Sequence, residues 1–289
     1  MEEKLTICFL GNAYSIHTTK WVKFFADRGH NVHLISYDRP KEYLPPNINL
    51  YLIGKKLPFK LWRINTLFNL PLAFCQTKKI IKRIKPDIIH AHYITSYGHL
   101  ALLTGFRPLV VTAWGSDILI TPKESIIAGK IVKSVLKKTD LITCDADHMK
   151  EALIRFGADP FKIKIIYFGI DTKKFSPGDG DDELKKELGI SGLKSVISLR
   201  SLEQIYNIET LIKAMPLVLR EVSDARLIIA GIGSYEKKLK KMAKDMNLLK
   251  HIKFIGFVLN EDLPRYLRIA DVYVSTSLSD GGIASSTAS

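Results

Sequence analysis

The sequence is poor in cysteine and in glutamine. Cys8, Cys75 and Cys144 are the only cysteines in 289 residues, and glutamine occurs only at Gln76 and Gln204. Because the cysteines are odd in number and widely spaced, we expect buried thiols in a reducing compartment rather than disulfides, and their spacing matches no zinc site. The shortage of glutamine is a bias that would also suit a heat-adapted protein.

Long apolar runs are missing as well. The chain opens with Met1-Glu2-Glu3 and enters a strand-like run at once, and the apolar run near 67–75 is too short to span a bilayer. We therefore expect a cytoplasmic protein. With 46% hydrophobic residues, the chain can fill two ordinary globular domains.

Positive charge is abundant. The formal net charge of +14 suits a phosphate-rich partner, which would be nucleic acid, an anionic membrane surface or a nucleotide. Lysines on the polar faces of ordinary helices would give the same total. No known nucleic-acid module pattern is visible, so nucleic acid is not an expected partner.

Strand-like runs alternate with helical patterns along the whole chain, which predicts an α/β protein with doubly wound domains. A Pro-, Gly- and Asp-rich stretch at 175–182 predicts a linker, and we interpret its acidic residues as solvated rather than as a metal loop. The predicted strands are Leu5–Leu10, Val32–Ser36, Asp87–Ala91, Leu109–Thr112, Leu141–Cys144 and Ile163–Tyr167, followed by Val196–Leu199, Arg226–Ala230, Lys253–Ile255 and Asp271–Ser275.

The segment Ser195–Val222 joins an apolar strand to an amphipathic helix through a loop without glycine, which excludes a P-loop. Arg200 stands where the strand ends. Asn207 is placed to cap the helix, so that free N–H groups and the positive dipole end would face the same point as the guanidinium. This pattern is typical of an anion site, although a solvated arginine at a strand end has the same spacing.

The same segment resembles the start of the second domain in the retaining family 4 glycosyltransferases, which have the GT-B fold. IIYFGIDTKKFSPGD is similar to the interdomain signature of that family. The resemblance covers nearly all of the chain and implies two Rossmann-like domains, 1–172 on the acceptor side and 173–289 on the donor side, the second incomplete. It implies transfer of a hexosyl unit from a nucleotide diphosphate sugar to a hydroxyl of a glycan or lipid-linked acceptor, with retention and without a bound metal or cofactor.

The resemblance also implies a donor site. Many members hold the diphosphate with an Arg and a Lys, which align here with Ser201 and Tyr206, so Arg200 would act from one residue earlier and the second cation is missing. Arg200 and Asp117 are the implied catalytic residues. The implied donor-binding residues are Arg200, Tyr206, Asn207, Gly231, Gly233, Gly256, Phe257, Val258, Asp280, Gly281 and Gly282.

On the acceptor side, GNAYSIHTTKW resembles the first loop of the family and places Gly11 and His17 at the cleft. His17 contacts a substrate in this interpretation, or is a plain surface histidine. VVTAWGSD resembles the segment in which a His precedes Gly. Trp114 takes that position, where it can stack on a sugar but not exchange a proton. Asp117 orients a hydroxyl or caps the next helix.

His90 and His92 stand two apart on a predicted strand and therefore share a face. This spacing suits a metal pair, but it fixes no third ligand. The resemblance instead places His92 in the acceptor cleft, at the carboxyl end of its strand, where open α/β sheets bind ligands.

Residues 55–85 combine lysines and arginines with aromatic residues. The segment is either an ordinary amphipathic helix or a surface that lies on an anionic membrane, as would suit a lipid acceptor. The protein would then be peripheral on the inner face of the membrane.

At the end of the chain the family pattern stops, because Ala288 and Ser289 stand where relatives have a ribose-binding Glu. We expect a truncated second domain with strands in the order 3-2-1-4, Asp271–Ser275 at the edge, residues 278–289 loosely held, weak donor affinity and negligible transfer. A non-catalytic nucleotide-sugar or membrane-binding protein, or an inactive fragment of an enzyme, is therefore the alternative to a glycosyltransferase.

Overall fold

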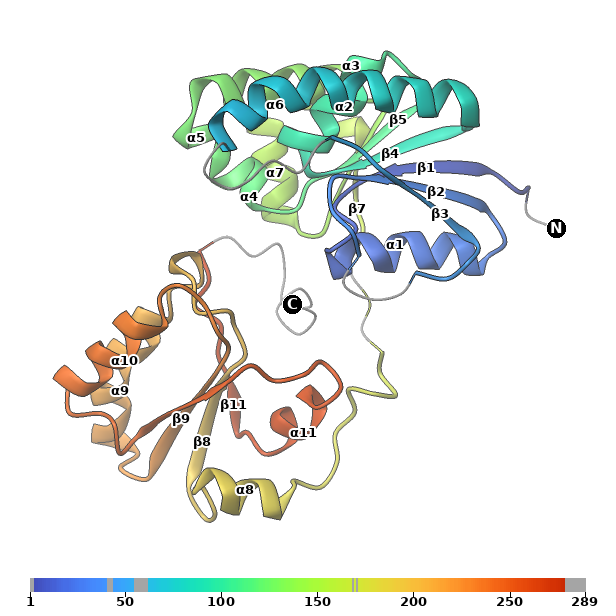
Figure 1. Cartoon of the computed structure of the whole chain (residues 1–289). Coiled ribbons are helices and arrows are strands. Elements are labelled where there is room, and N and C mark those ends of the chain that lie inside the picture. The colour runs from blue at the N-terminus through green and yellow to red at the C-terminus, as the bar shows by residue number, and fades with distance from the viewer. Residues whose placement is uncertain (1–2, 41–43, 55–61, 168, 170, 279–289) are drawn as a thin grey trace. The chain divides into compact units, whose positions relative to one another are not determined.

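The computed structural model describes residues 3–40, 44–54, 62–167, 169 and 171–278, without the side chains of residues 62–69 and 124 (Figure 1). Its contacts divide the chain into two units, residues 1–167 and 168–289, whereas the sequence placed the boundary after residue 172. Each unit has a parallel sheet with helices on both faces. The predicted α/β, doubly wound fold class is therefore confirmed.

The N-terminal unit contains a seven-stranded parallel sheet in the order β3-β2-β1-β4-β5-β6-β7. All six strands predicted there are present. The sequence interpretation missed β3, a partly exposed edge strand that follows Pro45-Pro46. The strands are β1 (Thr6–Leu10), β2 (Asn31–Ser36), β3 (Ile48–Leu52), β4 (Ile88–His92), β5 (Leu109–Thr112), β6 (Leu141–Cys144) and β7 (Ile163–Ile165).

Helices α2, α3 and α6 pack side by side on one face of this sheet, and α1 packs on the other (Figure 1). Alternation along β1 divides the core between these faces, since Cys8 and Leu10 belong to the first cluster and Ile7 and Phe9 to the second. The helices are α1 (Ile16–Asp27), α2 (Trp62–Ile84), α3 (His99–Thr104), α4 (Ser116–Leu119), α5 (Thr121–Glu124), α6 (Ile126–Lys138) and α7 (Asp147–Arg155), with a π-helix at Tyr93–Gly98.

The C-terminal unit has a four-stranded parallel sheet in the order β10-β9-β8-β11. This is the predicted 3-2-1-4 order, with β11 at the edge of the described sheet. Helices α9 and α10 cover one face, and α8 and α11 cover the other. The elements are α8 (Asp182–Leu188), β8 (Lys194–Ser198), α9 (Ile208–Glu221), β9 (Ala225–Ala230), α10 (Glu236–Asp245), β10 (Ile252–Gly256), α11 (Leu263–Arg268) and β11 (Val272–Tyr273).

Two expectations about single residues are wrong. Cys8 and Cys144 are buried free thiols, but Cys75 is exposed on α2. Asp181 is not simply solvated, because it caps α8 by accepting the Leu184 N–H at 2.9 Å and pairs with Arg265 at 2.6 Å. Among the helices that the structure describes, none combines the length and apolar content needed to cross a bilayer.

Candidate functional site

In the N-terminal unit, the loops that follow β1, β4 and β5 bring the predicted acceptor-side residues together. Gly11 directly follows β1, and at this residue the backbone passes close to both α1 and the end of β4. A Cβ on this residue would lie 2.9 Å from Cγ2 of Thr18 and 3.3 Å from Cβ of His92. Glycine at this position therefore allows the first turn of α1 to pack directly against the carboxyl end of β4.

Aromatic rings line this edge of the sheet. The ring centroids of His17 and Trp114 are 4.8 Å apart and tilted by 35°, and Trp114 lies 5.4 Å from His92. His17 and Trp114 are half-buried, whereas His92 is buried. The three predicted residues thus form one cluster, the ring cluster, in which His17 and Trp114 remain partly exposed.

His90 and His92 share one face of β4, as their spacing predicted. The Nε2 atom of His90 lies 2.6 Å from the Thr112 hydroxyl, which lies 2.6 Å from the Thr143 hydroxyl. Burial lowers the pKa of His90 to about 3. Burial, followed by the nearby His90 and His17, lowers the pKa of His92 well below its usual range, so both rings are neutral at pH 7.

The neutral His92 ring makes one hydrogen bond in the described part of the chain. Its Nδ1 lies 3.2 Å from Oγ1 of Thr18, while its buried Nε2 has no partner among the residues that the structure describes. No group of three or more His, Cys, Asp or Glu side chains is placed to hold a metal ion within the described ranges. Each of the two histidines is thus hydrogen-bonded to a threonine hydroxyl, His90 to that of Thr112 and His92 to that of Thr18.

Asp117 is fully buried in the first turn of α4. One carboxylate oxygen accepts the Ile94 N–H at 2.8 Å, and the other accepts the Trp114 N–H at 3.0 Å. Burial raises the pKa of Asp117 to about 6, although the backbone hydrogen bonds oppose this shift. The carboxylate ties the Trp114 loop to the π-helix, so its geometry favours a positioning role over contact with a substrate hydroxyl.

In the C-terminal unit, Arg200 follows β8 and is only 2% exposed. The alternative of a solvated arginine is therefore wrong. Its Cζ atom lies 4.5 Å from the ring centroid of Tyr206, which occupies the position where many family members have Lys. The ring face offsets part of the electrostatic cost of burying a guanidinium.

Asn207 stands at the start of α9, but it does not cap the helix as predicted. Its backbone is left-handed, with φ of 50°, and its side-chain oxygen accepts a hydrogen bond from the Thr210 hydroxyl at 3.0 Å. The side chain therefore satisfies none of the free N–H groups in the first turn of α9.

Gly231 and Gly233 lock the loop after β9 against the loop after β8. A Cβ on Gly231 would overlap the Arg200 carbonyl oxygen, and one on Gly233 would overlap the Leu202 carbonyl. The Leu202 N–H donates to the Ile232 carbonyl at 2.9 Å. Only glycine allows this approach, which holds the backbone of Arg200 in place.

Glu203 strengthens the same lock and was missed by the sequence interpretation. Its carboxylate accepts hydrogen bonds from both the backbone N–H and the hydroxyl of Ser234. Nothing in the spacing of an exposed glutamate with a distant serine could have predicted this contact.

The loops after β10 and β11 complete this edge. Gly256, with φ of 75°, accepts the Gly231 N–H at 2.7 Å, while Phe257 beside it is exposed and Val258 is half-buried. After β11, the Thr276 hydroxyl donates to the carbonyls of residues 206 and 207, and the Leu278 N–H donates to that of residue 205. The predicted donor residues Asp280, Gly281 and Gly282, and the segment 279–289, lie outside the described residues.

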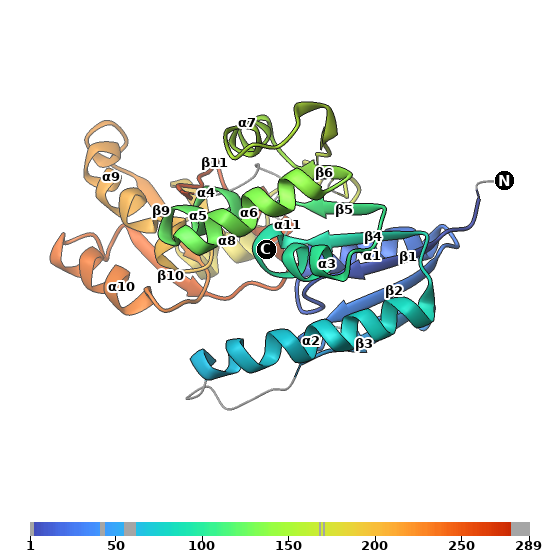
Figure 2. The same cartoon turned by 90° about the horizontal axis from the view of Figure 1, so that it is seen from above.

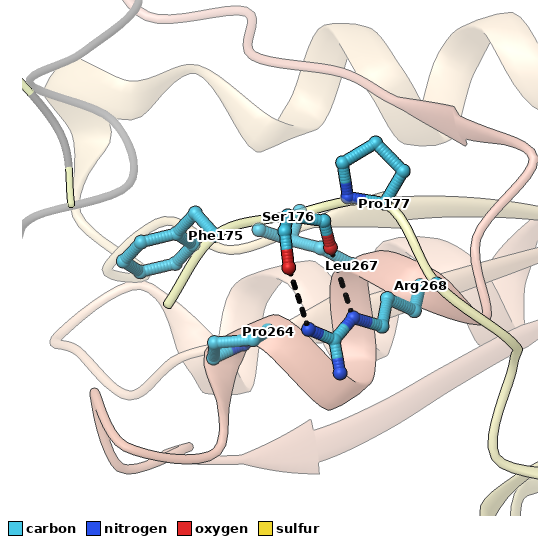
Figure 3. Close-up of a pocket in the computed structure, with 7 residues that line it drawn as sticks. Phe175, Ser176, Pro177, Pro264, Leu267 and Arg268 are labelled. Atoms are coloured by element: carbon cyan, nitrogen blue, oxygen red, sulfur yellow. Dashed lines mark hydrogen bonds between the residues drawn. The ribbon is translucent and has the colours of Figure 1, made fainter. Parts of the chain in front are cut away.

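A separate pocket of about 360 Å³ lies between α11 and the segment 175–178 (Figure 3). Arg268 crosses it and donates from Nε to the Ser176 carbonyl at 3.0 Å and from Nη2 to the Ser176 hydroxyl at 3.3 Å. Phe175, Pro177, Pro264 and Leu267 also line it. The start of the predicted linker is therefore tethered to α11.

Two family models match the chain. "Glycosyl transferase 4-like" matches residues 6–146, and "Glycosyl transferases group 1" matches residues 180–285. The matches fall on the N-terminal and the C-terminal unit respectively, and together they include both loop clusters described above.

Among curated proteins, the chain is 28% identical over 185 residues to the GDP-mannose-dependent alpha-(1-6)-phosphatidylinositol monomannoside mannosyltransferase of Mycobacterium tuberculosis, covering 61% of this chain and 48% of that protein. It is 26% identical over 228 residues to the alpha-monoglucosyldiacylglycerol synthase of Streptococcus pneumoniae, covering 72% of this chain and 50% of that protein. The chain thus spans about half the length of these relatives.

Among solved structures, HepE of Anabaena in complex with UDP-glucose superposes with a TM-score of 0.76 at 19% identity. The superposition covers 98% of this chain and 78% of that one. The likeness extends over both units and shows that they share the fold of this protein.

Proposed function

Because the chain belongs to the family 4 type of GT-B glycosyltransferases, we propose that it transfers a hexosyl unit from a nucleotide diphosphate sugar to a hydroxyl acceptor with retention of configuration. The donor diphosphate binds beside Arg200 at the carboxyl edge of the C-terminal sheet. The observation that carries this proposal is the buried Arg200, whose backbone is locked by Gly231 and Gly233 next to the start of α9.

Departure of a nucleoside diphosphate leaves negative charge that the protein must stabilise. A preorganised guanidinium and the free N–H groups of a helix start are suited to this task, and one well-placed donor contributes about 3 kcal/mol to such a transition state. The reaction needs neither a protein nucleophile nor a resident metal in this proposal. Anomeric configuration of the product, determined by NMR, tests retention, and an inverted product would contradict it.

Donor binding is tested by calorimetry of UDP, GDP and ADP with the full chain. We expect Arg200→Ala to bind the preferred nucleotide at least about tenfold more weakly, since a charged hydrogen bond to phosphate is lost. Arg220→Ala, which removes an exposed arginine from the end of α9, is the matched control. Equal affinity of Arg200→Ala and the wild type, with circular dichroism showing intact folding, would refute the role of Arg200.

The acceptor hydroxyl is proposed to bind at the ring cluster of His17, His92 and Trp114. Aromatic faces bind the apolar faces of sugars, and His17 and Trp114 are only half-buried, while the neutral, buried His92 supports the Trp114 ring. The two relatives are named for phosphatidylinositol monomannoside and for diacylglycerol, which supports a lipid-linked acceptor. Turnover of a nucleotide-sugar panel with glycolipid acceptors separates an enzyme from a non-catalytic binding protein.

A lipid-linked acceptor also supports peripheral association with the inner face of an anionic membrane through 55–85. In the described part of this segment, α2 exposes Lys78, Lys79, Lys82 and Arg83. Such a basic surface attracts anionic headgroups, and salt screens the attraction beyond about 8 Å at physiological ionic strength. Vesicle binding that persists on neutral lipids, or that fails on anionic ones, would contradict this association.

A further inference from the structure

The first turn of α6 exposes two adjacent isoleucines. Ile126 is 81% exposed and Ile127 is 72% exposed. The buried stripe of α6 is formed by Val132, Val135 and Leu136, which pack on the sheet. The packing of the helix therefore does not use the two isoleucines, and exposing large apolar side chains side by side marks a contact with another surface.

The isoleucines stand in a capped helical turn that has exposed lysines before and after it in the sequence. Ser125 caps α6 by accepting the Ala128 N–H at 3.3 Å, so the exposed turn has a defined conformation. Lys123 precedes the turn, and Lys130 and Lys133 follow it, all three exposed. Glu124 directly precedes the Ser125 cap, and the helix sequence IIAGKIVKSVLKK that follows contains no acidic residue.

This turn lies at the carboxyl edge of the N-terminal sheet. The chain passes from the Trp114 loop through α4 and α5 into α6, which then runs back across the sheet to its amino edge, where the Asp140 N–H bonds to the Leu109 carbonyl (Figure 2). The exposed turn and the ring cluster therefore belong to the same edge of one sheet.

We propose that the start of α6 is a membrane-insertion element, in which Ile126 and Ile127 enter the headgroup boundary of an anionic bilayer while Lys123, Lys130 and Lys133 contact lipid phosphates. Apolar insertion combined with basic side chains is the physical basis of interfacial binding. The surface that two isoleucines can bury is far smaller than the roughly 800 Å² per partner that a standard protein interface buries. Inserted into lipid, the same two side chains suffice as an anchor. The inference rests on the proposed function in one respect, namely that the edge faces a lipid-linked acceptor. The exposed basic residues of α2 precede β4 at the opposite, amino edge, so they are an alternative contact and not part of this one.

The test is co-sedimentation of the full chain with phosphatidylglycerol-containing vesicles and with pure phosphatidylcholine vesicles, in the absence of nucleotide. We expect the double variant I126S/I127S to bind anionic vesicles at least about a hundredfold more weakly, since burying each of the two isoleucines contributes about one factor of ten or more. The control is Phe161→Ser, which removes a 92% exposed aromatic residue that precedes β7 at the amino edge of the sheet. It should bind as the wild type does.

A second pair of variants separates local charge from net charge. K130Q/K133Q should weaken binding to anionic vesicles by about tenfold or more, because each lysine near the surface contributes about 1 kcal/mol. K241Q/K244Q removes the same charge from exposed positions of α10 and should have a much smaller effect. Equal losses in the two double variants would overturn the assignment to α6.

Two further outcomes would overturn the proposal. One is unchanged vesicle binding by I126S/I127S. The other is a wild type that is dimeric in lipid-free light scattering while I126S/I127S is monomeric, since the occupant would then be a second copy of the chain. Nucleotide calorimetry on the same proteins reports the donor site separately, so failure of membrane insertion is distinguishable from failure of the proposed transferase function.

Discussion

The two units use the same edge of a parallel sheet in opposite ways. In the N-terminal unit the edge is formed by side chains, namely the ring cluster, which includes the neutral, buried His92, and the neutral His90 beside it. In the C-terminal unit it is formed mainly by backbone, where Gly231 and Gly233 allow loops to touch and carry one buried guanidinium.

This difference corresponds to what each edge can recognise. Ring faces and a neutral imidazole suit uncharged groups such as sugar hydroxyls and apolar ring faces. A guanidinium beside free N–H groups suits an anion. The comparison teaches that one sheet architecture acquires complementary chemistry from the residues in its loops, and the predictions below test whether the two edges depend on different interactions.

The largest effect is expected for Gly231→Val. Its Cβ would overlap the Arg200 carbonyl at a φ of 154°, which we expect to destabilise the C-terminal unit by about 3–5 kcal/mol. In Gly256→Ala the new Cβ meets no atom within 4 Å, and only the φ of 75° is unfavourable for alanine. We therefore expect a destabilisation of about 1 kcal/mol. Urea denaturation measures both, with Gly169→Ala in open space as the control. Similar midpoints for Gly231→Val and Gly256→Ala would show that the lock is not essential.

The second-largest effect is expected from acidification, which should destabilise the N-terminal unit more than the C-terminal unit. Since the pKa of His90 is about 3 in the folded protein and about 6.5 in the unfolded chain, the unfolded state binds an extra proton between these pH values, and stability falls as the pH drops below 6.5. His90 alone should cost about 2 kcal/mol by pH 5, and His92 adds to this loss. Asp117, whose folded-state pKa is raised to about 6, stabilises the protein as the pH falls from 6 towards 3.8, by about 1.4 kcal/mol at pH 5, and so offsets only part of the loss from one histidine.

The C-terminal unit should resist this acidification. The Ser195 N–H holds the pKa of Asp271 below 3.8, so the stability from this carboxylate is kept until the pH falls below that value. Hydrogen exchange at pH 7 and pH 5 should therefore show lost protection in β4 and retained protection in β8. An equal loss of protection in β4 and β8 would contradict the expected difference in acid sensitivity between the two units.

A smaller effect is expected for Thr18→Val. This change keeps the shape of the side chain but removes the hydroxyl bonded to His92, which we expect to destabilise the N-terminal unit by about 1–2 kcal/mol. Thr19→Val is the matched control, because the Thr19 hydroxyl bonds only within α1, to the Ile16 carbonyl. Thermal unfolding followed by near-UV circular dichroism measures both. A loss no greater than that of the control would mean that His92 is positioned by packing alone.

The smallest effect is expected at Tyr206. Replacement by Leu removes the ring face under Arg200 and should weaken nucleotide binding by about 1 kcal/mol, or roughly fivefold, whereas Tyr206→Phe keeps the face and should be nearly neutral. Calorimetry with the preferred nucleotide distinguishes them. If Phe and Leu weaken binding equally, the hydroxyl rather than the ring supports Arg200.

Most of the architecture could be predicted, because buried parallel strands are visible as short apolar runs. Such runs led to ten of the described strands and to the 3-2-1-4 order of the second sheet. β3 was not predicted, because this edge strand is partly exposed and therefore has no continuous apolar run, and because two prolines precede it. The grouping of Gly11, His17, His92 and Trp114 was also predictable, since all four end strands or follow strand ends.

The remaining features of the site depend on tertiary contacts that local patterns do not encode. For Arg200 the sequence left open an anion site or a solvated strand end, and the structure buries it beside Tyr206. Asn207 was expected to cap α9 with its side chain, and it adopts a left-handed backbone conformation instead. Asp117 appeared to face substrate or cap a helix, yet its two oxygens bond to N–H groups of neighbouring loops. Each difference arises from a partner that is brought close only when the sheet has formed.

The hydrogen bonds that follow β11 make the C-terminal edge a coupled system. Thr276 and Leu278 bond to the carbonyls of residues 205–207, on the loop that carries Arg200. An interaction that stabilises these hydrogen bonds therefore also stabilises the conformation of the Arg200 loop. Because thermodynamic coupling is reciprocal, an anion that binds at Arg200 and stabilises this loop also stabilises the hydrogen bonds of the chain after β11. Donor binding would thus be read out at residues 276–278 by changes in hydrogen exchange, even though these residues need not touch the donor.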